Sequence, residues 1–572
     1  MRFFKKRRKY NLEIDPEDIL LDAHNIPSFD KQQFEGKLER PISKRSVYFI
    51  SIFFLLAGFV FISKLYSLQI ERGTVYAQKS DDNSYKEIFI FSDRGLILDR
   101  NGKEIAWNET QEGEKYPLRK YIAEPGFGHV LGYVSYPKKD AYGFYWQDEY
   151  IGEYGVEKLY NEELKGQNGA YLYELDAIKD TDENTEPEVT KTIDPIAGED
   201  VTLSIDADIQ AKMYAAIKSL AERAGYTGGA GAIMDVHTGE MIAMTSYPEF
   251  DPEVMSKRDD VAQIRSYQKD KSKPFINRVF GGLYTPGSPV KPFIAIGALN
   301  EDVITPEKQI YSAGQIELVS PYDKTQVYVY KDNKAHGWVD MRHALAVSSN
   351  VYFYEIGGGF EDQPGLGISK INYYTKLFGL DEKTGIELPG ELAGVIPSPE
   401  WKAENFNGDI WRVGDTYHTA IGQYGFQVTP LALLRGITTI ANNGIMLRPT
   451  IIKGATPDVV KNIEISDDYY QVVKDGMHLV TQEGTAQLLS YLDFDLAAKT
   501  GTAQVGIAKK EVNSWITGFF PYDNPKYSFI FLMEKGPKDT SSATNAAYEL
   551  LGYISKEKPE YLGLPKNTTE EE

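Results

Sequence analysis

Ser288 and Lys291 have the spacing that brings a hydroxyl and an amine onto one face of a helix. A serine hydroxyl is a poor nucleophile until a base takes its proton, and a lysine can be that base if burial or a second cation lowers its pKa. Pro286 and Gly287 break the chain before the serine, and Pro289 suits the first helical turn. We therefore expect Ser288 at a helix N-terminus, where the helix dipole favours negative charge.

This spacing alone is weak evidence, because serine and lysine recur three residues apart elsewhere in the chain. The other pairs are Ser28 with Lys31, Ser135 with Lys138, Ser266 with Lys269, and Ser555 with Lys558. An isolated pair of this kind usually lies on a solvated surface. Only Ser288 combines a preceding Pro-Gly, a following proline and an apolar run, PFIAIGAL, that would bury its helix.

A second polar group is Ser348-Ser349-Asn350, which precedes the apolar run VYFYEIG. One interpretation is structural, because serine and asparagine are common helix caps. The other is catalytic: Ser348 could relay a proton between Lys291 and a leaving amine, and Asn350 could hold a substrate amide.

A third group is Lys499-Thr500-Gly501, followed by Thr502, which has the pattern of a strand with a glycine that permits close backbone approach. A substrate strand could pair along it, and Lys499 is the candidate second cation beside Lys291. A second Lys-Thr-Gly, at residues 383–385, follows two acidic residues. We expect that copy to form an exposed turn with a structural role.

The elements around these groups predict an α+β fold. Strands at both ends of residues 201–555, with helical patches between them, favour one antiparallel sheet covered by helices. The expected elements are strands at Gly229–Asp235, Met241–Ser246, Ser514–Phe520 and Tyr527–Glu534, a helix with its buried face at Ile209, Met213, Ile217, Leu220 and Ala224, and a helix at Thr544–Ile554. Residues 69–200 have short β patterns, including a hairpin turn at Asn101-Gly102, and predict a β-rich stalk.

The N-terminal region predicts a single membrane span at residues 47–68, with Lys64 reaching the interface. Basic residues cluster before this run and not after it, so residues 1–46 are expected in the cytoplasm and the rest outside the cell membrane. The alternative, a cleaved signal peptide, is less favoured because no small-residue cleavage site follows the run. Residues 556–572 are expected to form a flexible C-terminal tail.

Composition excludes several kinds of site. The 572 residues suffice for two or three folded units. The absence of cysteine rules out disulfides, thiolate zinc sites and a cysteine nucleophile. A net charge of −21 argues against a nucleic-acid partner. The seven histidines have no metal-ligand spacing, so neither a metal nor a cofactor is expected.

With these motifs the chain resembles the class B penicillin-binding proteins, in which the same three groups recur. Within that family it is most similar to the elongation type, penicillin-binding protein 2. The resemblance extends over roughly residues 90–535 and includes RGLILDRNG, HVLGYVS, YGVEKLYNEELKGQNG, GEDVTLSIDADIQ, GAIMDVHTGEMIAM, YTPGSPVKPF, TGIELPGE, PGELAGVIPSPEWK, GDTYHTAIGQYGFQVTPL and SWITGFFP.

The resemblance implies an elongated stalk (pedestal) domain and a β-lactamase-like transpeptidase domain with a five-stranded antiparallel sheet. It implies a D,D-transpeptidase that cross-links peptidoglycan stem peptides in cell elongation and shape maintenance, and that binds β-lactams covalently. A RodA-type glycosyltransferase and other elongation-complex membrane proteins are the implied partners. The implied roles are nucleophile for Ser288, base for Lys291, proton relay and substrate holder for Ser348 and Asn350, substrate binding for Lys499, Thr500, Gly501 and Thr502, and oxyanion hole for the backbone N–H groups of Ser288 and Thr502.

Three departures from the family pattern stand out. Pro289 replaces the usual threonine after the nucleophile. The stretch between the membrane span and the nucleophile is shorter than is usual for penicillin-binding protein 2. Ser349 stands where some relatives carry cysteine, which removes any metal site that would use that cysteine. Four other functions share the motifs: a division-type transpeptidase, a D,D-carboxypeptidase, a β-lactamase and a non-catalytic β-lactam-binding scaffold. Rapid turnover of a chromogenic β-lactam would favour the β-lactamase, and drug binding without cross-linking would favour the scaffold.

Overall fold

The computed structural model describes residues 44–66, 85–174, 189–320, 323–506, 510–538 and 540–564. The chain divides into two compact units, Met1–Lys86 with Glu174–Lys179, and Glu87–Tyr173 with Asp180–Glu572. In the first unit, helix α1 (Lys44–Tyr66) exposes large apolar side chains such as Phe49, Leu55 and Phe59. Across the described ranges, no helix meets the length and apolarity needed to cross a membrane. The span expected at residues 47–68 therefore stays a prediction, and most of the expected tail, residues 1–46, lies outside the described residues.

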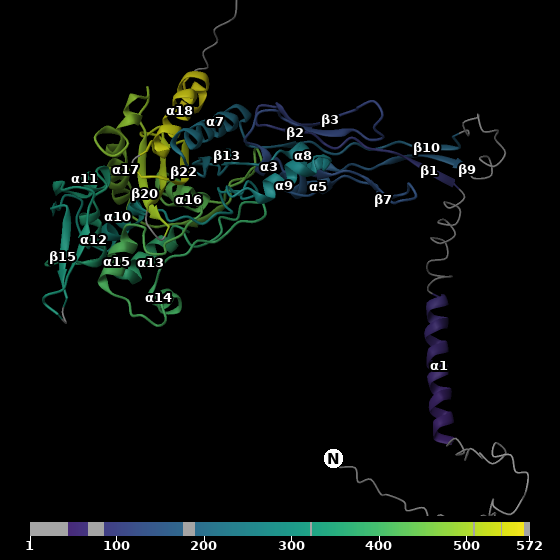
Figure 1. Ribbon diagram of the computed structural model, residues 1–572, viewed down its shortest axis with the longest axis horizontal. Coiled ribbons are helices and arrows are strands. Elements are labelled where there is room, and N and C mark those ends of the chain that lie inside the picture. The colour runs from purple at the N-terminus through teal and green to yellow at the C-terminus, as the bar shows by residue number, and fades with distance from the viewer. Residues whose placement is uncertain are drawn as a thin grey trace, which may run out of the picture. The chain divides into compact units, whose positions relative to one another are not determined.

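An antiparallel five-stranded sheet forms the centre of the second unit, in the order β13-β12-β22-β21-β20 (Figure 1). Its strands are β12 (Gly228–Asp235), β13 (Met241–Tyr247), β20 (Ala497–Val505), β21 (Glu511–Phe520) and β22 (Tyr527–Pro537). The register of β12 with β22 places Ala232 opposite Ile530, so strands from the two ends of this region lie side by side. This arrangement confirms the antiparallel sheet predicted from the sequence.

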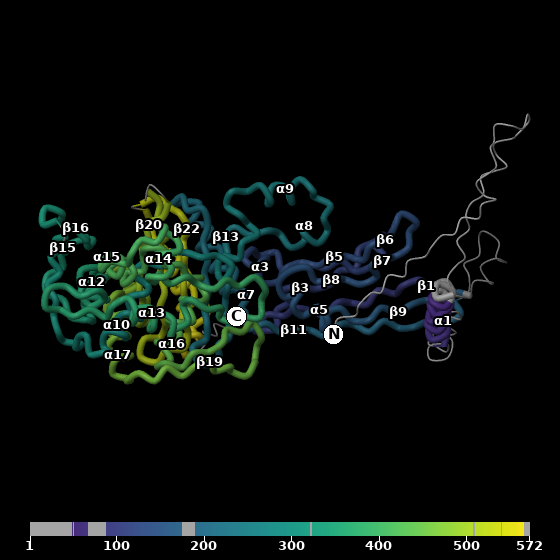
Figure 2. The backbone as a smooth tube through the Cα atoms, turned by 90° about the horizontal axis from the view of Figure 1, so that it is seen from below, coloured from purple at the N-terminus to yellow at the C-terminus, as the bar shows by residue number. Residues whose placement is uncertain are grey.

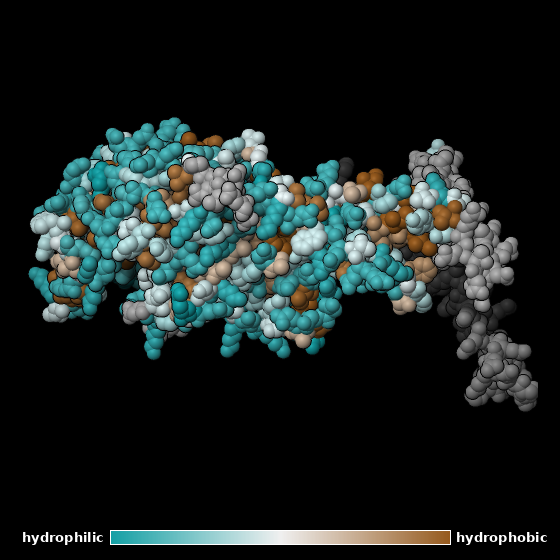
Figure 3. Space-filling model, turned by 90° about the horizontal axis from the view of Figure 1, so that it is seen from above, coloured by the Kyte–Doolittle hydropathy of each residue, from teal (hydrophilic) through white to brown (hydrophobic). Residues whose placement is uncertain are grey.

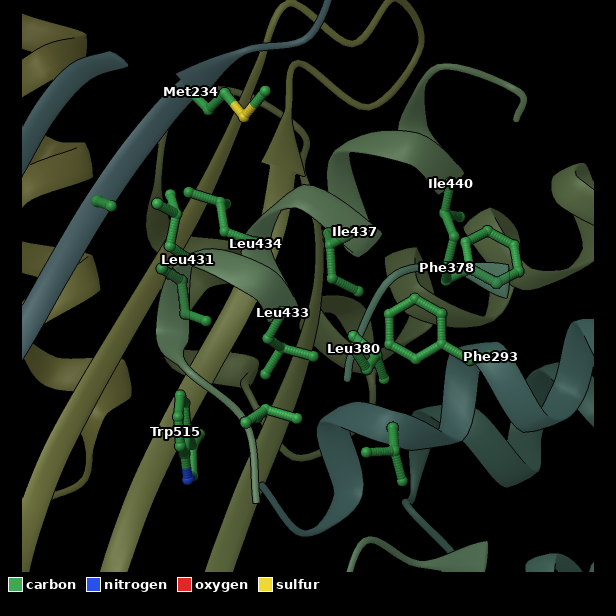
Figure 4. Packing of buried hydrophobic residues seen from close by; sticks show 14 of the residues in the cluster. Met234, Phe293, Phe378, Leu380, Leu431, Leu433, Leu434, Ile437, Ile440 and Trp515 are labelled. Atoms are coloured by element: carbon green, nitrogen blue, oxygen red, sulfur yellow. The ribbon is translucent and has the colours of Figure 1, made fainter. Parts of the chain in front are cut away.

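Helices cover both faces of the sheet, as Figure 1 shows. On one face, α7 (Ala207–Ala224) and α18 (Ala543–Glu557) bury residues such as Met213 and Leu550 against the sheet. On the other face, α16 (Pro430–Ala441) packs between the sheet and α10 (Lys291–Asn300). Figure 4 shows leucines and isoleucines of α16 between Met234 and Trp515 of the sheet and Phe293 of α10. The helix that carries Lys291 is thus fixed by the core.

Further helices and strands lie around the sheet and the helices named above, among them the 16-residue helix α17 against β20. They are α8 (Pro252–Lys257), α9 (Val261–Lys269), η4 (Ser288–Val290), β14 (Ile310–Ser312), β15 (Gln315–Val319), β16 (Val327–Lys331), β17 (Gly337–Val339), α11 (Met341–Ala346), α12 (Asn350–Gly358), α13 (Gly367–Leu377), α14 (Pro399–Asn405), α15 (Val413–Ala420), β18 (Ile445–Leu447), β19 (Val459–Asn462), α17 (Asp467–Gln482), η5 (Gln487–Tyr491) and η6 (Pro559–Leu562).

The stalk is rich in short strands, as expected. One sheet has the order β11-β2-β3-β4, another the order β1-β9-β10, and β5 with β8 and β6 with β7 form hairpin-like pairs (Figure 2). The strands are β1 (Tyr85–Ile90), β2 (Ile97–Leu98), β3 (Glu104–Glu109), β4 (Leu118–Tyr121), β5 (Val134–Ser135), β6 (Lys138–Lys139), β7 (Tyr145–Gln147), β8 (Ile151–Gly152), β9 (Gly169–Glu174), β10 (Lys191–Ile193) and β11 (Val201–Thr202), with helices α3 (Gly128–Leu131), α4 (Gly155–Leu159) and α5 (Asn161–Leu164). Gly102 has a φ of 85°, which forms the expected turn between β2 and β3.

The boundary between stalk and catalytic region falls inside a sheet. Strand β11 pairs in parallel with β2, with Val201 opposite Ile97. One hydrophobic core continues from Ile105 of the stalk to Ile205 and the sheet beyond it. Residue 200 therefore separates two sequence regions but not two independent cores.

The C-terminal boundary also differs from the expectation. Helix α18 continues to Glu557 and η6 follows it. The Tyr561 hydroxyl donates to Asp206 Oδ2 at 2.9 Å, and Lys558 Nζ lies 2.8 Å from Asp208 Oδ2. These contacts with the start of α7 hold residues 556–564 in place, so a flexible tail cannot begin at residue 556.

Candidate active site

Ser288 lies at the start of a helical segment, as predicted, although the first turn is the 3-10 helix η4 and α10 follows at Lys291. Gly287 precedes it with a φ of 64°, a conformation that glycine adopts without strain, and donates to Gly422 O at 2.9 Å. Ser288 itself is half-buried. Within the parts of the chain that the structure describes, its hydroxyl has no hydrogen-bond partner, so it is available to a ligand.

Lys291 is completely buried and makes three hydrogen bonds. Its Nζ donates to Ser348 O at 2.7 Å, to Asn350 Oδ1 at 2.8 Å and to Ser348 Oγ at 3.3 Å. Burial lowers the pKa of Lys291 to about 7, although the charge of Asp332 opposes this shift. An amine with that pKa is partly neutral at physiological pH and can accept a proton.

Ser348 lies between two buried lysines. Its hydroxyl is 3.3 Å from Lys291 Nζ and 2.8 Å from Lys499 Nζ. Burial, and then the neighbouring Lys291, hold the pKa of Lys499 well below its usual range. We had expected Lys499 to be the second cation that lowers the pKa of Lys291. Instead burial alone lowers the pKa of Lys291, and it is the charge of Lys291 that acts on Lys499. One hydroxyl between two amines is the geometry that a proton relay needs.

The Lys499-Thr500-Gly501 group lies on β20, which is an edge of the sheet, so its outer side can pair with an extended ligand. Gly501 faces the Ser288 turn: a Cβ at this position would lie 2.3 Å from Pro289 Cδ and 2.9 Å from Pro286 O. Glycine here lets the strand approach the nucleophile's turn, and Thr502, beside it, is exposed. We had expected Gly501 to make room for a substrate backbone, and the structure shows that it makes room for the Pro286–Pro289 segment of this chain.

The second Lys-Thr-Gly has the expected structural role, but it is not an exposed turn. Thr384 is buried, and its backbone N–H donates to Glu391 Oε1 at 2.6 Å. The N–H of Gly385 donates to the other oxygen of Glu391 at 3.0 Å. Glu391 thus fixes this segment, which the two preceding acidic residues did not indicate.

Two residues near the site had not been expected from the sequence. Thr485 shares a short hydrogen bond between hydroxyls with Thr500, and its N–H donates to Ala346 O at 3.2 Å, close to Ser348. Asp332 accepts hydrogen bonds from Ser349 Oγ and Val351 N. Both belong to loops whose sequences carry no recognisable signal. No group of acidic and histidine residues suited to a metal ion occurs in the described ranges.

Comparison with known proteins agrees with this geometry. The model of the penicillin-binding protein transpeptidase domain matches residues 229–552, and that of the penicillin-binding protein dimerisation domain matches residues 111–203. The chain belongs to the penicillin-binding protein transpeptidases, of the class B type with a stalk domain. The stalk and the catalytic sheet each have their own family match.

Relatives extend over most of the chain. It is 26% identical to the peptidoglycan D,D-transpeptidase MrdA of Haemophilus influenzae, over 91% of this chain and 93% of that protein. It is 30% identical to MrdA of Acinetobacter baumannii, over 76% of this chain and 65% of that one. The crystal structure of Pseudomonas aeruginosa PBP2 in complex with WCK 5153 is similar with a TM-score of 0.66 and 28% identity, over 82% of this chain and 96% of that one. The structure of Helicobacter pylori PBP2 in complex with MreC is similar with a TM-score of 0.67 and 26% identity, over 82% of this chain and 98% of that one.

Proposed function

We propose that this protein is a peptidoglycan D,D-transpeptidase of cell-wall elongation, with Ser288 as its nucleophile. The observation that carries the proposal is that the half-buried Ser348 hydroxyl joins the buried amines of Lys291 and Lys499, with Lys291 three residues after Ser288. The family match and the MrdA relatives support the reaction and the elongation role.

In the first step, neutral Lys291 takes the proton of the Ser288 hydroxyl as its oxygen attacks the carbonyl between the last two D-alanines of a stem peptide. The backbone N–H groups of Ser288 and Thr502 stabilise the negative oxygen of the tetrahedral intermediate. The C–N bond then breaks, Ser348 passes its proton to the leaving amine and takes the proton held by Lys291, and D-alanine departs. Ser288 is left as an ester with the shortened stem.

In the second step, an amine from a neighbouring stem attacks the ester carbonyl and gives its proton to Lys291 through Ser348. The ester C–O bond breaks, Ser288 takes the proton back as its hydroxyl is released, and the new amide is the cross-link. Asn350 holds the substrate amide. Lys499, Thr500 and Thr502 bind the terminal carboxylate of the donor along the free edge of β20 until it leaves with D-alanine in the first step. A β-lactam presents the same acyl group in a strained ring, so it would acylate Ser288 and remain attached.

We also propose a single-pass membrane anchor in α1, with a cytoplasmic N-terminus and the catalytic unit outside the cell membrane. The exposed apolar side chains of α1 and the basic residues before it support this placement. A RodA-type glycosyltransferase is the proposed partner. Figure 3 shows apolar side chains gathered on the stalk, where Phe144 is 73% and Trp146 65% exposed, and such a surface suits contact with another protein.

The test is cross-linking by the full chain, supplied with pentapeptide stems as donors and an amine acceptor. The proposal expects released D-alanine and cross-linked dimers in equal amounts, and neither product with Ser288→Ala. Ser266→Ala, which alters another serine three residues before a lysine, should retain both. Release of D-alanine without dimers would make the protein a carboxypeptidase and overturn the proposal.

A further inference from the structure

We propose that Asp332, which lies outside the three motifs, is a positioning residue that fixes Ser348 and Asn350 against Lys291. The inference deepens the proposed function and rests on it. Asp332 lies in the loop between β16 and β17, and its side chain is completely buried. A buried carboxylate is costly unless several donors pair with it, so its contacts indicate what it is there to hold.

One oxygen of this carboxylate collects three donors. Asp332 Oδ2 accepts from Ser349 Oγ at 2.8 Å, from Val351 N at 3.0 Å and from Ser312 Oγ at 3.3 Å. The hydroxyls of Ser312 and Ser349 also lie 3.0 Å apart. The carboxylate thereby joins β14 to the start of α12.

These contacts surround the two residues that meet Lys291. Ser349 is the N-cap of α12, Asn350 is its first residue and Val351 its second. Ser348 has a φ of 58°, a left-handed conformation that a serine keeps only when its surroundings enforce it. By holding Ser349 and the N–H of Val351, Asp332 fixes the backbone on the helix side of Ser348.

Asp332 also contributes a negative charge that acts on Lys291. The charged and titratable groups that face this region are Lys291 from α10, Lys499 from β20, Tyr354 from α12, and His336 and Lys334 from the same loop. Burial lowers the pKa of His336, so its ring is neutral at pH 7, and burial raises the pKa of Tyr354, so its hydroxyl keeps its proton. The charge of Asp332 acts on Lys291 in the direction that keeps the amine protonated.

Two variants of the full chain separate the positioning effect of Asp332 from the effect of its charge on Lys291. The measurement is the rate of acylation by a fluorescent penicillin from pH 5 to pH 9. Asp332→Asn should slow acylation by up to about a hundredfold, because misplaced catalytic groups cost rates of that order. It should also move the acid limb of the profile to lower pH, since Lys291 loses a charge that favours its protonation. Ser349→Ala should slow acylation and leave the acid limb in place.

Asp206→Asn is the matched control, because Asp206 is also a buried carboxylate that accepts from backbone N–H groups at a helix start, but it contacts α7, Asn101, Lys558 and Tyr561. It should lower the melting temperature without moving the acid limb. An Asp332→Asn protein with the wild-type acid limb would overturn the inference. If that variant does not fold, a wild-type acylation rate in Ser349→Ala would overturn it instead. If the wild-type protein itself is not acylated by the penicillin, the result contradicts the proposed function rather than the role of Asp332.

Discussion

The two lysines have different tasks although one hydroxyl joins them. Lys291 lies on the helix that begins at the nucleophile, and burial brings its pKa to about 7. Lys499 Nζ donates to the same Ser348 hydroxyl from β20, the strand that we propose binds substrate. In the proposed mechanism, Ser348 relays the proton taken from Ser288 to the leaving amine.

The first prediction concerns the pH dependence of acylation in the wild type. Below pH 7, Lys291 holds a proton in the free enzyme and cannot act as a base. Because its pKa is lowered from 10.5 to about 7, the rate should rise about tenfold per pH unit up to this value and then level off. Stopped-flow measurement with a fluorescent penicillin checks this, and a rate that rises only above pH 9 would contradict the lowered pKa of Lys291. A rate that does not change between pH 5 and pH 9 would contradict its role as the base.

At the scale of elements, the site is made by β20 and η4 lying against each other. The strand can approach the turn because Gly501 has no side chain where Pro289 lies. Pro289 replaces the threonine that is usual in the family, and its ring is the nearest neighbour of Gly501, so this departure makes the glycine more important here.

The second prediction is that Gly501→Ala separates the two elements. The added methyl group would overlap the Pro289 ring, at a cost of about 1–3 kcal/mol for overpacking, and acylation should slow as Ser288 moves from β20. Gly552→Ala on α18 is the control, because a Cβ there has an ordinary contact at 3.7 Å. Acylation at the wild-type rate in Gly501→Ala would show that the strand can shift freely.

A third prediction tests the core of the stalk. Glu157 is buried between Arg94 and Arg119, at 2.6 and 2.7 Å from their Nε atoms. Glu157→Gln leaves two buried cations without a counter-charge, so we expect a loss of about 3–5 kcal/mol in the free energy of unfolding. Urea denaturation measures it. Glu162→Gln, at an exposed ion pair with Lys165, should change nothing measurable, and an equal effect of both variants would contradict the assignment.

Local sequence predicted the elements better than the contacts between them. The Pro-Gly-Ser-Pro segment marked the helix start at Ser288, and short apolar runs marked the strands of the sheet. Asp332 and Thr485 gave no such signal, because each acts through residues brought near by the fold. The C-terminal boundary was wrong for the same reason: Tyr561 is held by Asp206, 355 residues away in the sequence.

At the scale of the whole molecule, stalk and catalytic region share strand β11 and one core. Glu249 Oε2 also accepts the N–H of Gly128 at 2.8 Å, and Gln210 Nε2 donates to Gly126 O at 2.6 Å. These contacts tie α3 of the stalk to the catalytic sheet and α7. The two regions match separate family models, but they share one hydrophobic core.

The fourth prediction follows from that shared interior. Residues 87–564 should unfold in one cooperative calorimetric transition, because the stalk cannot lose its core without exposing that of the catalytic region. Glu157→Gln should therefore lower the melting temperature of the whole transition. Two resolved transitions, with only the first shifted by this variant, would show that the stalk unfolds by itself.

The central claim is that Ser288 forms the acyl-enzyme, and intact-mass measurement of the full chain after incubation with benzylpenicillin tests it most directly. The account predicts one stable adduct with the mass of the drug on the wild type and on Ser266→Ala, and none on Ser288→Ala. An adduct that persists in Ser288→Ala, or a wild type that gains no mass, would contradict it.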